Sequence, residues 1–260
     1  MRIVRFTIHN RVKYGAVDEN TIHGLRGSPF TRFKGPSSSL TLDGSVYRLH
    51  EVRLLAPCSP SKVVCLGLNY YSHAEETKLP TPSMPLIFLK PPTAVIGPDD
   101  KIILPRDSKR VDYEGELGVV IGKKAKDVPE EKAKEHILGY TCFNDVSERF
   151  AQREDGQWTR AKGYDTFAPI GPWVETDVDP DDLKLETYLN GEPRQSARTS
   201  NIIFGVSKLV NFVSQVMTLL SGDVIATGTP SGIGPMNAGD IVEVRIEKIG
   251  TLRNLVVKQK

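Results

Sequence analysis

The sequence predicts a mostly β protein with a few helices, an α+β fold whose strands form a barrel-like arrangement or a folded roll. Three observations lead to this prediction: many short β-favouring runs, few helical segments, and long loops rich in Pro and Gly. A chain of 260 residues can hold one large domain, or one domain with a small appendage. Apolar residues make up 39% of it and charged residues 25%, which suits a globular protein with a sizeable core.

The first 56 residues form the candidate appendage, a small N-terminal β domain. Strands are predicted over residues 3–8, 12–17 and 21–25, with turn signals at Asn10 and at residues 18–20. Residues 26–44 are rich in Gly, Pro and Ser and are predicted to be loop. Pro57 and Pro60 then flank a short segment that is predicted to mark the end of this domain. We therefore expect two domains, at 1–56 and 57–260.

The larger domain is predicted to alternate short strands with three helical segments. Apolar residues at positions 209, 210, 213, 216, 217 and 220 give residues 207–220 the spacing of an amphipathic helix. Shorter helices are expected at 70–78 and around 129–135, where Pro129 suits a first turn. The predicted strands cover residues 62–68, 86–89, 94–96, 101–104, 111–121, 137–144, 185–189, 224–226, 241–246 and 252–257.

Charge and composition exclude several classes of protein. The chain has 34 basic and 32 acidic residues, a formal net charge of +2, and no long Lys/Arg run that would indicate nucleic-acid binding. No apolar run approaches the ~20 residues of a membrane-spanning helix, and the N-terminus lacks the apolar region of a signal peptide. Three cysteines without C-x-x-C spacing argue against a disulfide framework or a thiolate zinc site. We expect a cytoplasmic protein.

The strand at 111–121, V-D-Y-E-G-E-L-G-V-V-I, carries acids on one of its faces. Side chains alternate along a strand, so Glu114 and Glu116 lie on the same side, roughly 7 Å apart. Asp145 ends another apolar run, and if that strand is a neighbour, three carboxylates converge. Such a cluster needs a cation to offset its repulsion, and oxygen ligands favour Mg²⁺, Mn²⁺ or Ca²⁺ over zinc. The competing interpretation is a solvent-facing strand with surface acids. Asp112 lies nearer the loop end, and we expect it outside the ligand set.

Two further features could carry chemistry. His73 and Glu76 are three residues apart on the predicted helix at 70–78, so they face the same way, and a carboxylate beside an imidazole suits a general base. The alternative is an exposed helix with routine charges. Lys162, in a loop of small and aromatic residues, could neutralise an anionic substrate or lie in solvent.

The glycine-rich stretch 222–234, G-D-V-I-A-T-G-T-P-S-G-I-G, follows a predicted helix. It lacks G-K-[ST] and G-x-G-x-x-G spacing, which argues against nucleotide binding. A turn whose N–H groups and Thr229 hydroxyl hold a carboxylate fits it better.

Taken in order, these stretches resemble the fumarylacetoacetate hydrolase family from about residue 56 to residue 257. The pieces that carry the resemblance are V-V-C-L-G-L-N-Y with H-A-E-E, P-L-I-F-L-K-P-P-T-A-V-I-G-P, D-Y-E-G-E-L-G-V-V-I-G, G-Y-T-C-F-N-D-V-S-E-R, A-K-G-Y-D-T-F-A-P-I-G-P-W, L-N-G-E-P-R-Q and G-D-V-I-A-T-G-T-P-S-G-I-G. The resemblance implies a mixed β-roll, usually with a small N-terminal domain, and commonly a homodimer.

The resemblance also implies a set of site residues. A divalent metal, Mg²⁺ or Mn²⁺, would be held by Glu114, Glu116 and Asp145. His73 and Glu76 match a His–Glu pair that activates water from a mobile lid. The remaining matches are substrate-facing or charge-balancing positions: Lys162, Arg149, Gln152, and the turn at Gly228 and Thr229.

Three functions follow as hypotheses. The first is hydrolytic C–C cleavage of an acylpyruvate-type β-diketo acid, with His73 activating water and Lys162 offsetting the charge of the enolate. The second uses the same enolate for oxaloacetate decarboxylation or tautomerisation, or for isomerisation of a 2-hydroxyhepta-2,4-diene-1,7-dioate. The third is a binding module without chemistry. Arg149 would suit a second substrate carboxylate, which favours a dicarboxylic compound.

Overall fold

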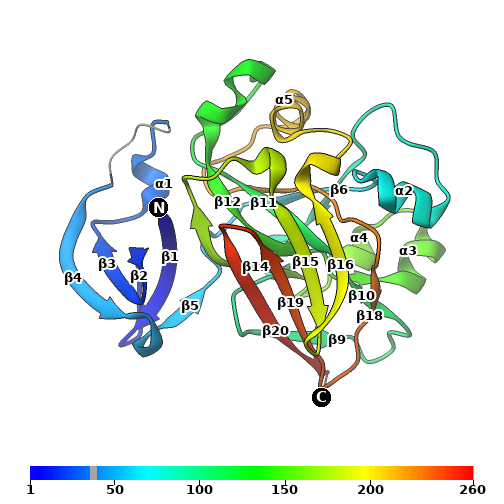
Figure 1. Ribbon diagram of the computed structural model, residues 1–260, viewed down its shortest axis with the longest axis horizontal. Helices are drawn as coiled ribbons and strands as arrows, with labels where there is room; N and C mark the ends of the chain where they lie inside the picture. The colour runs from blue at the N-terminus through cyan, green and yellow to red at the C-terminus, as the bar shows by residue number, and fades with distance from the viewer. Residues whose placement is uncertain (36–39, 260) are drawn as a thin grey trace.

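The computed structural model describes residues 1–35 and 40–259 (Figure 1). Strands dominate it, so the mostly β prediction is confirmed. The strands of the described ranges lie in a twelve-stranded, a five-stranded and a three-stranded sheet. Residues 36–39, which fall in the loop predicted at 26–44, lie outside the described residues.

The N-terminal strands form one end of the large sheet and stand at the left of Figure 1. They have a small core of their own, built from Val4, Phe6, Val17 and Ile22. Strand β1 also pairs with β14 in the larger part of the chain, so the sheet runs on without a break and the division at residue 56 stays a prediction. The segment between the third and fourth strands contains a helical turn that the sequence analysis assigned to loop. The elements are β1 (Arg2–Ile8), β2 (Arg11–Asp18), β3 (Thr21–Leu25), α1 (Pro29–Arg32), β4 (Leu42–Arg48), η1 (Leu49–Glu51) and β5 (Arg53–Leu55).

The large sheet is centred on two strands, β11 (Gly115–Ile121) and β12 (Ile137–Asn144), in which every residue is buried. Burial on both faces explains why residues 137–144 form a continuous apolar run instead of an alternating one. One face packs on a core that includes Leu117, Val119 and Ile121, and the other packs on a second core that includes Val120 and Phe143. The sheet continues through β6 (Val63–Leu66), β7 (Ile87–Lys90), β8 (Val95–Ile96), β14 (Ala168–Glu175) and β17 (Val224–Ala226).

The five-stranded sheet lies against β11 and β12, in front of them in Figure 1, and closes the roll. Its inward side chains Val244, Ile246 and Leu252 join the core under β11. The strands are β9 (Lys101–Leu104), β15 (Lys184–Leu189), β16 (Glu192–Arg198), β19 (Ile241–Ile246) and β20 (Gly250–Lys258).

The longest helix in the described part of the chain, α5 (Val206–Val216), covers one edge of this core with Leu209, Val210 and Val213. It ends four residues before the end of the predicted helix, because Leu219 pairs through both backbone groups with Ala125 instead of continuing the helix. The helix expected around residue 129 is a 3₁₀ helix. The remaining helical elements are α2 (Tyr71–Thr77), η2 (Pro92–Ala94), η3 (Glu130–His136), α3 (Arg149–Asp155), α4 (Thr159–Lys162), η4 (Pro180–Asp182) and η5 (Thr199–Asn201).

Among the described elements, sequence analysis missed the α-helices α1, α3 and α4 and the strands β4, β5, β13 (Ser147–Glu148), β14, β16 and β18 (Gly234–Pro235). Strand β14 contains two prolines and a glycine, and β16 is largely polar, so neither shows a strand pattern. The short helices α3 and α4 are polar as well, and α3 is defined by its cap, where the Glu148 side chain accepts a hydrogen bond from the Ala151 N–H.

The strand predicted at 111–121 is divided at Glu114. Its first part, β10 (Val111–Tyr113), belongs to the small sheet with β13 (Ser147–Glu148) and β18 (Gly234–Pro235), while its second part is β11 of the large sheet. The chain thus changes sheets at the residue where the acidic cluster begins.

Candidate metal centre

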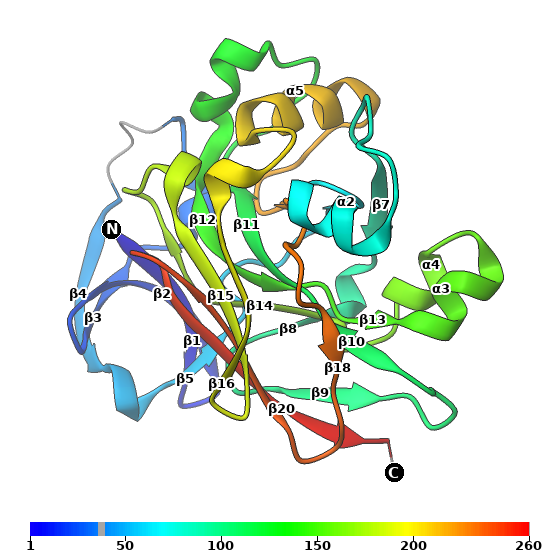
Figure 2. The same cartoon turned by 45° about the vertical axis from the view of Figure 1, so that its right-hand side comes forward.

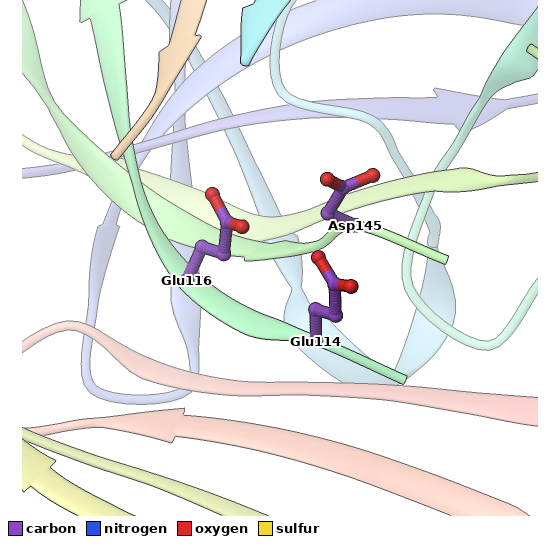
Figure 3. A group of neighbouring side chains, drawn as sticks. All are labelled: Glu114, Glu116 and Asp145. Atoms are coloured by element: carbon purple, nitrogen blue, oxygen red, sulfur yellow. The ribbon is translucent and has the colours of Figure 1, made fainter. Parts of the chain in front are cut away.

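Three carboxylates converge where the chain changes sheets. The side chains of Glu114, Glu116 and Asp145 each offer an oxygen, and these atoms lie within 4.8 Å of one another (Figure 3). The pairing of β11 with β12 causes the convergence: Gly115 lies opposite Asn144, and the N–H of Asp145 donates to the carbonyl of Glu114 at 2.8 Å. The Asp145 strand is therefore the neighbour that the sequence analysis required.

The acids do not face solvent, so the interpretation of a solvent-facing strand is wrong. Glu116 and Asp145 are 0% exposed and Glu114 is 5% exposed. Three cations surround them. Lys162 Nζ lies 2.9 Å from Glu114 and 2.7 Å from Asp145, Lys90 Nζ lies 2.7 Å from Asp145, and Arg149 Nη2 lies 2.5 Å from Glu114. Three carboxyl groups thus face three cationic side chains.

The two glutamates differ in their tendency to ionise. Burial would raise the pKa of the Glu114 carboxyl, but Lys162 and Arg149 outweigh it and hold the pKa below its ordinary value. Glu116 forms no ion pair with a cation of the described residues, and the charge of Lys162 lowers its pKa only in part. Burial, together with the charges of Asp145 and Glu114, raises its pKa well above the ordinary value. Of the two glutamates, Glu116 is therefore the one whose negative charge is less well compensated by nearby cations.

The cluster fits a divalent cation. Glu116 Oε2 accepts a hydrogen bond from the Gly228 N–H at 2.7 Å, while the buried Oε1 has no hydrogen-bond partner among the described residues. Asp145 Oδ1 lies within ion-pair distance of Lys90 but outside hydrogen-bond geometry. Buried carboxylate oxygens with unused lone pairs are hard ligands of the kind that Mg²⁺ and Mn²⁺ take.

Asp112, the third acid of the strand, lies outside this group. Its Oδ1 accepts from Arg110 Nε at 2.8 Å and its Oδ2 from Arg149 Nε at 2.9 Å. Asp112 therefore contacts Arg149, which in turn contacts Glu114.

The histidine and glutamate of helix α2 meet as their spacing implies. His73 Nδ1 lies 2.8 Å from Glu76 Oε2, which leaves Nε2 as the other ring nitrogen, and His73 is 7% exposed. Glu76 Oε1 accepts the N–H of Gly232 at 2.9 Å, and Ser72 Oγ accepts the N–H of Ser231 at 3.3 Å. Helix α2 is thereby attached to the glycine-rich turn, beside which it lies in Figure 2.

The glycine-rich turn is tied to the acidic strand. Gly228 has φ +94°, and a Cβ there would lie 2.8 Å from the Cβ of Asn69, so both its conformation and its surroundings require glycine. Its N–H is used by Glu116. The hydroxyl of Thr229 donates to the carbonyl of Gly115 at 2.9 Å and accepts from Gln195 at 2.8 Å. The expected roles of Gly228 and Thr229 as substrate contacts stay predictions.

Two site residues escaped the sequence analysis. Lys90 is 0% exposed and ends the apolar run P-L-I-F-L-K, and a lysine closing a buried strand was the signal that could have identified it. Gln195 is 1% exposed, accepts the Gly115 N–H at 2.9 Å, and donates to Thr229 and to the carbonyl of Pro230. It connects the five-stranded sheet to both the acidic strand and the glycine-rich turn, and no local pattern around it indicates this.

The site borders a cavity of about 470 Å³. His73, Glu114, Arg149, Gln152 and Lys162 line it, so the structure brings five of the candidate residues to one space. Cysteine chemistry is not available there, because all three cysteines are buried and burial raises the pKa of Cys142 to about 12 and that of Cys65 well above its ordinary value.

Comparison with known proteins identifies the family. Residues 62–257 match the family described as "Fumarylacetoacetate (FAA) hydrolase C-terminal". The chain belongs to the fumarylacetoacetate hydrolase family. Residues 1–57 match a second family, described as "Rv2993c-like, N-terminal".

Relatives of this fumarylacetoacetate hydrolase family protein span several reactions. The protein Rv2993c of Mycobacterium tuberculosis is 48% identical, with 100% of this chain and 99% of that protein covered. A solved structure from Mycobacterium smegmatis, described as 5-carboxymethyl-2-hydroxymuconate delta-isomerase, is 47% identical with a TM-score of 0.92 over 100% of both chains. The mitochondrial oxaloacetate tautomerase of Bos taurus is 44% identical, with 80% of this chain and 70% of that protein covered.

A further solved structure, of a relative, contains a metal ion. The maleylpyruvate hydrolase of Sphingobium sp. SYK-6, solved with manganese(II) and pyruvate, is 29% identical with a TM-score of 0.82 over 100% of both chains. The chain is thus an enzyme of a superfamily that includes hydrolases, isomerases and a tautomerase, with an acidic triad that could bind a metal. Within the described residues, no helix has the length and apolarity to cross a membrane.

Proposed function

We propose that this enzyme hydrolyses a C–C bond in an acylpyruvate-type β-diketo acid, using a divalent metal. The observation that carries the proposal is the His73–Glu76 pair, whose histidine lines the same cavity as Glu114 of the carboxylate triad. Glu114, Glu116 and Asp145 would hold Mg²⁺ or Mn²⁺. The bound ion would supply Lewis-acid stabilisation of negative charge on the 2-oxo group.

The protein's own residues would move the proton. Glu76 accepts the Nδ1–H of His73, so Nε2 carries the lone pair that takes a proton from water. The resulting hydroxide attacks the carbonyl distal to the 2-oxo acid. The C–C bond next to that carbonyl breaks, its electron pair forms the enolate of pyruvate, and the acyl group leaves as a carboxylic acid. The protonated His73 returns the proton to the enolate carbon, which gives pyruvate.

Charge balance supports an enolate-forming reaction. The triad is neutralised by Lys90, Lys162 and Arg149, so a divalent cation leaves an excess of two positive charges. The carboxylate and enolate of pyruvate carry two negative charges and would match that excess. Lys162, 2% exposed, lines the cavity and is the cation best placed to offset the enolate.

A second candidate uses the same enolate without attack by water. It is tautomerisation or decarboxylation of oxaloacetate, or isomerisation of a 2-hydroxyhepta-2,4-diene-1,7-dioate. The relatives named as an isomerase and a tautomerase favour it. Their named activities belong to those proteins, and here they define the alternative substrates to assay. A homodimeric state and a cytoplasmic location also stay proposals.

Assays of the purified enzyme with acetylpyruvate, fumarylpyruvate and oxaloacetate distinguish the two. We expect Mn²⁺-dependent release of pyruvate from an acylpyruvate, loss of that activity with EDTA, and a fall of at least a hundredfold in His73→Ala. Turnover that survives removal of the metal, or that is unchanged in His73→Ala, would contradict the proposal. Activity with oxaloacetate alone would favour the second candidate.

A further inference from the structure

The cavity beside the triad has a wall without charge. Its apolar lining includes Leu79, Pro82, Leu86, Phe88, Trp158 and Ile233. The Phe88 and Trp158 rings pack edge to face with centroids 5.1 Å apart. A Cβ on Gly67 would lie 2.9 Å from Leu86 and 3.2 Å from Trp158, so these two side chains also meet at one place on the wall.

Both permanent cations among the described lining residues already face carboxylates. Arg149 Nε donates to Asp112 at 2.9 Å and Nη1 donates to Gln152 at 2.8 Å, while Nη2 lies 2.5 Å from Glu114, at ion-pair distance but outside hydrogen-bond geometry. Lys162 lies between two members of the triad. A substrate with a second, distal carboxylate would therefore compete with Asp112, Glu114 and Asp145 for these cations, and against the apolar wall it would lose hydration without gaining a cation of its own.

The same wall leaves apolar surface exposed. Leu79 is 55% exposed and Leu86 is 50% exposed, and both belong to the segment that joins α2 to β7. Contact with an apolar ligand would remove this surface from water, which favours binding. A volume of about 470 Å³ is in the range of small-molecule sites and leaves room beyond a bound pyruvate unit.

From the apolar wall and the engaged Arg149, we infer that the group beyond the diketo acid in the substrate is an uncharged alkyl or aryl chain. The inference rests on the proposed function and adds the class of acyl group. It replaces the expectation that Arg149 receives a second carboxylate. Arg149 instead orients Glu114, and specificity comes from the wall at Leu79, Leu86, Phe88 and Trp158.

Binding of unreactive 2-oxo acids tests the inference directly. 2-Oxo-4-phenylbutanoate and 2-oxoglutarate share the 2-oxo acid and differ in the distal group, and neither has the distal carbonyl needed for hydrolysis. Calorimetry with the Mn²⁺-loaded protein should show at least tenfold tighter binding of the phenyl compound. The value of kcat/KM should be correspondingly higher for benzoylpyruvate than for fumarylpyruvate.

Substitutions of residues in the apolar wall provide a second test of the inference. Leu86→Arg places a cation on the wall at a half-exposed position, and Leu79→Arg does the same just beyond the C-terminal end of α2. Each should shift the binding ratio at least tenfold toward 2-oxoglutarate. Met84→Arg is the matched control, because Met84 is 64% exposed in the same segment and is not among the lining residues. It should leave the ratio unchanged.

The outcomes separate this inference from the proposed function. Equal or tighter binding of 2-oxoglutarate by the native protein, with fumarylpyruvate the better substrate, overturns the inference and leaves acylpyruvate hydrolysis standing. An unchanged ratio in both folded arginine variants also overturns it. If neither 2-oxo acid binds the metal-loaded protein, both the inference and the proposed function are wrong.

Discussion

Lys90 and Asp145 form an ion pair that is closed to solvent. Lys90 Nζ lies 2.7 Å from Asp145 Oδ1, and both side chains are 0% exposed. Lys90 also donates to the carbonyls of Val146 and Phe167 at 2.9 and 2.6 Å. Burial lowers the pKa of Lys90 and Asp145 opposes that shift. The pair joins the end of β7 to the residue that follows β12, and so fixes the third carboxylate of the triad.

Lys90→Met should destabilise the metal-free protein, because it leaves one cation fewer beside buried carboxylates. Loss of one partner of a buried pair costs about 3–5 kcal/mol, which urea unfolding would measure. Bound Mn²⁺ restores positive charge at the triad, so the rise in Tm on adding Mn²⁺ should be larger in Lys90→Met than in the native protein.

Lys62→Met is the matched control. Lys62 Nζ lies 2.6 Å from Asp223, which is also fully buried, but Asp223 is not a member of the acidic triad. This variant should lose stability without a change in the Mn²⁺-dependent rise in Tm. If the two variants showed the same rise, Lys90 would not act through the charge of the triad.

The roles of the acids in V-D-Y-E-G-E can be separated by two isosteric changes. Glu116→Gln removes a carboxylate whose Oε1 has no hydrogen-bond partner in the described part of the chain, and it should lower Mn²⁺ affinity at least tenfold. Asp112→Asn removes a charge that contacts Arg110 and Arg149, and it should change Mn²⁺ affinity less than threefold. Calorimetric titration with Mn²⁺ measures both. Equal losses would show that Asp112 belongs to the ligand set.

The raised pKa of Glu116 gives a stability prediction with a definite sign. The folded, metal-free protein keeps a proton on Glu116 at pH values where the unfolded chain has lost it. Its stability therefore falls as pH rises from the ordinary carboxyl pKa through the raised value. Glu116→Gln removes this term, so the metal-free variant should have a higher Tm than the native protein at pH 8, and the difference should vanish near pH 4.

Differential scanning calorimetry in EDTA checks this prediction. A gain of 1 kcal/mol corresponds to about 2–4 °C for a chain of this size class. Glutamine can keep the hydrogen bond from the Gly228 N–H, so the substitution isolates the charge. A variant that is less stable than the native protein at pH 8 would contradict the unfavourable charge assigned to Glu116.

Most strands and the acidic cluster could be predicted from the sequence, because they follow from local patterns. Residues 21–25, 101–104, 137–144, 224–226 and 241–246 are strands with the predicted bounds. The break at Glu114 could not be predicted, because the alternation of residues 111–121 continues across it. The break is a consequence of pairing with two different partners, β12 and β18, far apart in the sequence.

Sequence reasoning missed the residues that surround the triad and hold its strands in place. Gly115 illustrates the reason, because a Cβ there would lie 2.1 Å from Thr187 Oγ1. Thr187 and Gln195 come from β15 and β16, and Lys90 comes from β7. These residues approach the triad only because the roll closes. Residue spacing along one strand cannot report such contacts. The contact of Arg149 with Asp112 is another of these, whereas its expected substrate-facing position came from the family resemblance and stays a prediction.

The pair His73 and Glu76 gives the last prediction. Glu76 accepts the Nδ1–H of His73 at 2.8 Å and the N–H of Gly232 at 2.9 Å. A glutamine has a single acceptor oxygen, so it removes the charge and keeps one of these two hydrogen bonds. Glu76→Gln should lower kcat for an acylpyruvate at least tenfold, because the imidazolium formed when His73 takes a proton loses its carboxylate partner. Mn²⁺ affinity should be unchanged.

The matched control is Glu75→Gln, the same change at the neighbouring exposed residue of the helix. It should leave kcat within twofold. Equal kcat values for the two variants would mean that the pair does not take part in the reaction.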